Sequence, residues 1–113
     1  MEILELKNGS VDVDNVSTYE ALRNKLAVIR QRLDCVTNSA FKSEYTSFYL
    51  GNVYQHAVEN KHYIRLVNVL EDDRSGNRMS MDEELKQDII DFLTAKFIEQ
   101  MNQVITQMNE LIK

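Results

Sequence analysis

The residues of this chain whose types and spacing suit binding chemistry are basic side chains and tyrosines. Four basic residues flank an apolar seam in an expected helix: Arg23, Lys25, Arg30 and Arg32. A second set follows later in the chain: Tyr45, Tyr49, Lys61 and Arg65. Cationic side chains beside tyrosine rings suit a small nucleotide-like anion, because the charge attracts phosphate and the ring stacks on a base. The positive flanks equally suit an acidic protein partner.

Both sets also have a structural interpretation, which the sequence leaves open. The basic flanks favour an acidic neighbour, and the last helix offers four acidic residues: Glu83, Glu84, Asp88 and Asp91. Charge matching within the chain would then explain the flanks. The tyrosines can likewise pack in a core or an interface with the hydroxyl reaching water.

Catalytic chemistry finds little support, so we expect neither enzymatic activity nor a cofactor. The chain has one cysteine and two histidines, with no phosphate-binding glycine loop and no nucleophile elbow. Glu59 and His62 have the E-x-x-H spacing of a helical carboxylate metal site. Such sites need a second pair and two further glutamates, and no second E-x-x-H exists here. A metal-dependent enzyme is the least favoured class.

Composition points to a single domain spanning residues 1–113. The formal net charge of -5 repels phosphate backbones at long range, so we expect no nonspecific nucleic-acid binding. A lone cysteine, Cys35, cannot form an intramolecular disulfide. No signal-peptide pattern is visible, and no apolar run approaches the ~20 residues that cross a membrane. We therefore expect a cytoplasmic protein without a membrane span.

The elements that position these residues are expected to be mainly helical, since the chain has no proline and only three glycines. The strongest pattern predicts a helix over 80–112, where apolar residues recur every seven positions and a second apolar row runs alongside. This wide stripe must be covered by another helix or by another copy of the chain. The predicted oligomer interface contains Phe97, Met101, Val104, Ile105, Met108, Leu111 and Ile112.

The N-terminal residues 1–14 are predicted to form a β-hairpin, because Asn8 and Gly9 are the strongest two-residue turn signal. Pairing across this turn would set Leu6 opposite Val11. After the hairpin, Ser17 begins a capping-box pattern, and the apolar spacing that follows predicts a helix over 17–36.

The middle of the chain has two interpretations. The first is a helix over 40–71 that forms a long antiparallel hairpin with 80–112, joined by a turn around Gly76. The alternative ends that helix at Asn60 and makes 62–70 a third strand beside the N-terminal hairpin, which would give an α+β fold.

We therefore expect a mainly α protein: an N-terminal β-hairpin, one medium helix and a long helical hairpin. The expected function is a non-enzymatic protein-protein interaction module, such as an adaptor, inhibitor or assembly factor, which acts as a helical homo-oligomer. The alternative is a protein that binds or sequesters a small anionic, nucleotide-like ligand. The expected partners are further copies of the chain and another protein.

Overall fold

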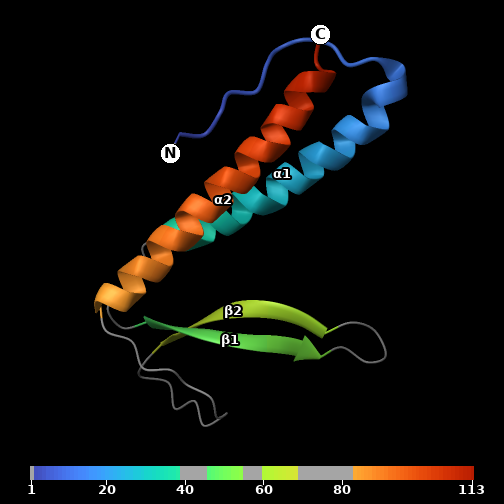
Figure 1. Cartoon of the computed structure of the whole chain (residues 1–113). Coiled ribbons are helices and arrows are strands. Elements are labelled where there is room, and N and C mark those ends of the chain that lie inside the picture. The colour runs from blue at the N-terminus through green and yellow to red at the C-terminus, as the bar shows by residue number, and fades with distance from the viewer. Residues whose placement is uncertain (1, 39–45, 55–59, 69–82) are drawn as a thin grey trace.

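The computed structural model describes residues 2–38, 46–54, 60–68 and 83–113, with side chains for 2–38 and 83–113. A short 3-10 helix, Val13–Asn15, leads into helix α1, Val16–Thr37. Strands β1, Thr46–Tyr54, and β2, Asn60–Asn68, follow, and helix α2, Glu83–Leu111, ends the fold (Figure 1). The part with described side chains is mainly helical, as the composition predicted.

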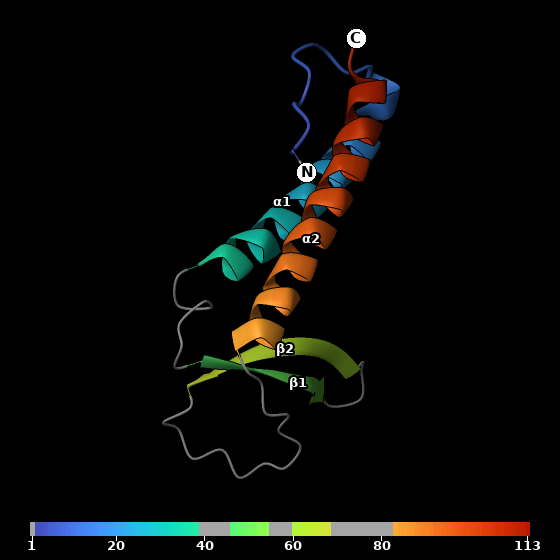
Figure 2. The ribbon, with the colours of Figure 1, turned by 60° about the vertical axis from the view of Figure 1, so that its left-hand side comes forward.

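Helices α1 and α2 lie side by side and run in opposite directions, as both ribbon views show (Figure 2). From Leu26 to Val36, every third or fourth residue of α1 is buried, as the seam predicted, and Leu22 is partly buried. The main core cluster contains Leu26, Ile29, Leu33, Met101, Val104, Ile105 and Met108. A smaller cluster joins Val36 near the end of α1 to Ile90 near the start of α2. The apolar stripe of α2 is therefore covered within one chain.

The long helix expected over 40–71 is wrong. Within that range the structure has β1 and β2, which pair antiparallel from Thr46 opposite Asn68 to Tyr54 opposite Asn60. The register sets Phe48 opposite Leu66. Both strands contain aromatic and β-branched residues, such as Tyr49, Val53, Tyr63 and Ile64, which favour a strand. The remaining expected helix residues and the expected turn lie outside the described residues.

The alternative of a strand over 62–70 is right in part, because β2 covers Asn60–Asn68. Its partner is different from the one expected: β2 pairs with β1 and not with the N-terminal region. The helix that packs along α2 is α1, which spans Val16–Thr37 against an expected 17–36. The N-cap of α1 is Asn15, so the capping box that Ser17 suggested is not formed.

The expected β-hairpin of residues 1–14 is also wrong. Residues 2–11, here called the strap, run in an extended path along the C-terminal half of α2 (Figure 1). The strand-like pairing described within 2–14 is a single bridge from Val11 to Ile112. Leu6 therefore does not pair with Val11. Four backbone groups of the strap, on Glu2, Leu4, Glu5 and Lys7, are bound by side chains of α2 instead.

Candidate functional site

The strap is held on α2 by asparagine side chains that bind its backbone. The amide nitrogen of Asn102 donates to the carbonyl oxygen of Glu2 at 2.9 Å. The Oδ1 atom of the same side chain accepts from the backbone N–H of Leu4 at 2.8 Å. An asparagine side chain carries one carbonyl oxygen and one NH₂ group, so it can bind a backbone N–H and a backbone carbonyl at the same time.

Asn109 repeats this arrangement two helical turns later. Its amide nitrogen donates to the carbonyl oxygen of Glu5 at 3.0 Å, and its Oδ1 accepts from the backbone N–H of Lys7 at 2.8 Å. Each asparagine thus clamps a carbonyl and the N–H two residues further along. The two clamps together fix residues 2–7 against the helix.

The spacing of the clamps matches the two chains. Asn102 and Asn109 are seven residues apart, which is about 10.5 Å along an α-helix. The groups they bind repeat after three residues of the strap, which span roughly 9–10 Å when extended. A repeat of three is that of a polyproline II helix, whereas equivalent groups of a β-strand repeat after two. The strap therefore presents its free carbonyl and N–H groups to α2 at a spacing that matches two turns of the helix.

The strap also binds the C-terminal end of α2. The Lys7 ammonium lies 3.5 Å from the carbonyl oxygens of Asn109 and Ile112. These carbonyls lie at the C-terminal end of α2, where a helix favours positive charge. Lys7 thus caps α2.

Beyond Lys7, the strap crosses the end of α2 and turns toward α1. Ser10 accepts a backbone hydrogen bond from Lys113 at 2.9 Å. Asp12 Oδ1 lies 2.8 Å from Lys113 Nζ. At the crossing, a β-carbon on Gly9 would collide with the carbonyl oxygen of Lys113. Gly9 therefore permits a close backbone approach, and this is the role it has in place of the predicted turn.

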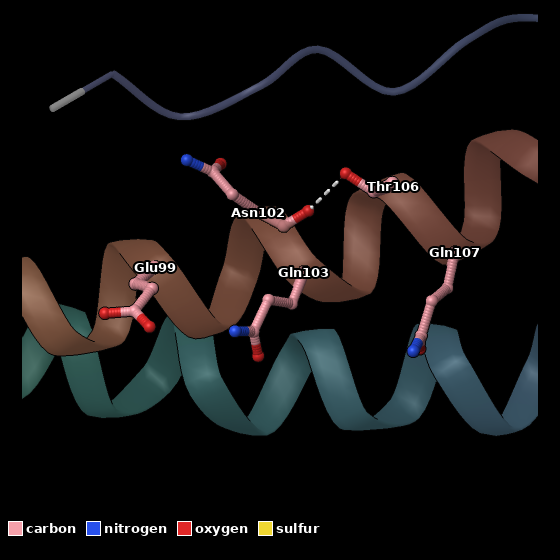
Figure 3. A pocket seen from close by; sticks show the side chains of 5 residues that line it. All are labelled: Glu99, Asn102, Gln103, Thr106 and Gln107. Carbon is pink, nitrogen blue, oxygen red and sulfur yellow. Dashed lines mark hydrogen bonds between the residues drawn. The ribbon is translucent and has the colours of Figure 1, made fainter.

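The opposite flank of α2 forms a groove with α1, with a cavity volume of about 440 Å³. Its lining residues are Lys25, Val28, Ile29, Arg32, Gln100, Gln103, Val104 and Gln107. Figure 3 shows Gln103 and Gln107 directed toward α1, while Asn102 is directed toward the strap. The groove combines two cationic side chains with three amides and contains no carboxylate. A shallow hollow on the outer face of α2, between groove and strap, is lined by Glu99, Asn102, Gln103, Thr106 and Gln107.

The structure divides the predicted binding residues into separate groups. Lys25 and Arg32 line the groove, whereas Arg23 and Arg30 are exposed on α1 and do not line it. In the β1–β2 register, Tyr49 is opposite Arg65 and Lys61 is opposite Val53. Tyr45 lies outside the described residues.

Charge matching between the two helices is not found. Within residues 2–38 and 83–113, none of the four predicted basic residues forms an ion pair with the acidic residues of α2. The antiparallel packing explains this, since Val36 clusters with Ile90 and Leu93. The acidic start of α2 therefore lies level with the C-terminal end of α1, beyond the basic residues.

The predicted oligomer interface is largely buried within one chain. Met101, Val104, Ile105, Met108 and Ile112 are each at most 6% exposed. Phe97 and Leu111 are partly buried. Met101, Val104, Ile105 and Met108 pack against α1 in the main core cluster, so a second copy can reach them only where α1 moves.

Sequence reasoning missed the two asparagines and the glutamines of the groove. Asn102 and Asn109 sit at seven-residue spacing beside the row Ile98, Ile105 and Ile112. Polar residues beside an apolar stripe are ordinary in an amphipathic helix, so this spacing alone did not single them out.

The described residues contain neither a metal-binding cluster nor a membrane-spanning helix. In these segments no group of three or more His, Cys, Asp or Glu side chains is placed to hold a metal ion. Neither α1 nor α2 contains a stretch that is apolar enough to span a membrane.

Comparison with known proteins gives no relative: no protein-family model, no curated protein and no solved structure matches this chain.

Proposed function

We propose that this protein is a non-enzymatic protein-protein interaction module that acts as a helical homo-oligomer. The observation that supports the proposal is the pair of clamps on α2. Asn102 and Asn109 bind a stretch of extended polypeptide through its backbone alone. A helix face that binds extended chain in this way suits an adaptor or an assembly factor.

Backbone recognition explains why such a module needs no reactive residues. The hydrogen-bonding groups are those that every non-proline residue carries. Affinity then depends on an extended conformation and on free backbone groups at the right repeat. Specificity is left to the side chains around the clamps.

The test of this function is the mass in solution, measured by light scattering on a sizing column over a tenfold dilution. A stable multiple of 13.2 kDa supports the homo-oligomer. A single species of 13.2 kDa at every concentration contradicts it.

A second candidate function is binding of a small anionic ligand in the groove between α1 and α2. Lys25 and Arg32 supply positive charge there, and the three glutamines supply amide donors. A cavity of about 440 Å³ falls within the size of small-molecule sites.

Thermal stability tests the second candidate, since a ligand that binds only the folded state raises the melting temperature. Nucleotides and phosphorylated metabolites should raise it in the wild type but not in Lys25→Ala/Arg32→Ala. The matched control is Arg23→Ala/Arg30→Ala, which removes the same amount of charge from α1 outside the groove. If both double variants lost the ligand-induced rise in melting temperature equally, the result would contradict a site in the groove.

A further inference from the structure

We infer that the strap site on α2 also binds the strap of a second copy of this chain, so that reciprocal exchange of residues 2–11 builds the oligomer. The inference rests on the proposed function and names the segment that joins the copies. Exchange of an identical element is a low-cost route to a dimer, because every contact of the closed chain is made again between copies.

The contacts of the strap do not require it to belong to the same chain. All four clamp hydrogen bonds join an α2 side chain to strap backbone. Lys7 and Ser10 likewise bind backbone groups at the end of α2. A strap from a second copy carries the same groups in the same order, including the glycine that passes Lys113.

The strap can also leave α2 without exposing much of the core. Residues 2–10 are exposed throughout. Ile3, Leu4 and Leu6 remain 44%, 49% and 41% exposed while the strap is bound. Opening therefore breaks hydrogen bonds at the surface and exposes the covered parts of these three side chains, and exposed segments of this kind are the first to open in a folded protein.

The tether to α1 decides when exchange occurs. A short tether gives the chain's own strap an effective concentration in the millimolar range. In a reciprocal pair, each strap is tethered to its partner in the same way once the first has exchanged. Exchange should therefore increase with protein concentration and, once formed, persist on dilution longer than a single contact would.

The test mixes two full-length variants, each with one reporter cysteine, and adds a short bis-maleimide. Both carry Cys35→Ser, since Cys35 is an exposed free thiol. One has Glu5→Cys in the strap, where the native side chain is exposed and only the carbonyl contacts Asn109. The other has Thr106→Cys, which lies between the two clamps and faces the strap (Figure 3).

A linked pair between residue 5 of one copy and residue 106 of the other, identified by mass spectrometry, is expected. Adding Asn102→Ala/Asn109→Ala to the Thr106→Cys copy should reduce its yield by about tenfold. The control replaces Thr106→Cys with Gln103→Cys, which points away from the strap. Circular dichroism checks that every variant remains helical.

The outcomes separate the two proposals. An oligomeric mass without the 5-to-106 link, or with a link that the asparagine variants leave unchanged, overturns strap exchange and leaves the proposed homo-oligomer standing. A mass of 13.2 kDa at all concentrations overturns both. An oligomeric mass with an asparagine-dependent link supports both.

Discussion

Gly9 lies so close to Lys113 that a β-carbon at residue 9 would collide with the carbonyl oxygen of Lys113 and lie 2.7 Å from Cγ2 of Ile112. The strap can cross the end of α2 at this height only because residue 9 has no side chain. The crossing and the two asparagine clamps together define the path of residues 2–11. These contacts dock the strap along α2.

Replacing Gly9 should displace the strap from the end of α2. We expect Gly9→Val to lower the free energy of unfolding by about 1–3 kcal/mol, because its side chain would collide with the Lys113 carbonyl oxygen and with the Ile112 side chain. Urea unfolding gives the free energy, and amide chemical shifts of residues 2–11 report the displacement.

Asn8→Ala is the control for this change, since Asn8 is exposed and its side chain lies outside the clamps. It should change stability by less than about 0.5 kcal/mol. If Asn8→Ala lowered the free energy of unfolding as much as Gly9→Val, a two-residue turn at 8–9 would explain the data better.

Removing both clamps should release the strap while the helices stay folded. We expect Asn102→Ala/Asn109→Ala to lower the free energy of unfolding by about 1–3 kcal/mol, because it removes four surface hydrogen bonds that each contribute modestly. Proteolysis of the N-terminal segment should become faster, with helical circular dichroism unchanged. Gln103→Ala/Gln107→Ala is the matched control on the same helix. The clamps would be ruled out as the holding contacts if both pairs gave the same cleavage rate.

The core between α1 and α2 should be sensitive to a cavity at its centre. Met108 is 0% exposed, so Met108→Ala should lower the free energy of unfolding by about 2–5 kcal/mol. Val28 is 47% exposed on α1, and Val28→Ala should change it by less than about 0.5 kcal/mol. Urea unfolding compares the two. Similar losses would mean that α1 and α2 do not pack through this seam.

A charge at Ile105 should unfold the chain and should not merely separate copies. The side chain is 2% exposed within one chain, and a buried unpaired carboxylate is strongly unfavourable. Ile105→Glu should therefore lose helical circular dichroism at a lower temperature at any protein concentration. Thr106→Glu, at the exposed neighbouring position, should not. A fully stable Ile105→Glu monomer would place Ile105 in an interface between copies instead.

The helices were predictable from the sequence because their stability comes from apolar spacing that is visible locally. Leu26, Ile29 and Leu33 recur at helical intervals, and all are buried. The N-terminal region was not predictable in this way. Asn8 and Gly9 are a strong local turn signal, but contacts with residues more than a hundred positions away decide the path. The middle region was ambiguous because β-branched and aromatic residues also occur at helical spacing there.

The candidate site was predictable only in part. The basic flanks of α1 were visible, but the sequence could not say which flank faces α2, so Arg23 and Arg30 were grouped with Lys25 and Arg32. Asparagine on a helix surface usually contacts water, and no local pattern shows that another segment lies above it. The clamps became visible only once the strap was placed.

Amide hydrogen exchange at single-residue resolution tests the central claim, that α2 holds the strap by its backbone, most directly. The N–H groups of Leu4 and Lys7 should exchange slowly, because each donates to an asparagine. Their neighbours Ile3 and Glu5, for which the described segments contain no acceptor, should exchange quickly. Asn102→Ala should speed the exchange of the Leu4 N–H more than that of the Lys7 N–H, because Asn109 still binds Lys7. Equal exchange rates at all four amides in the wild-type protein would contradict the account.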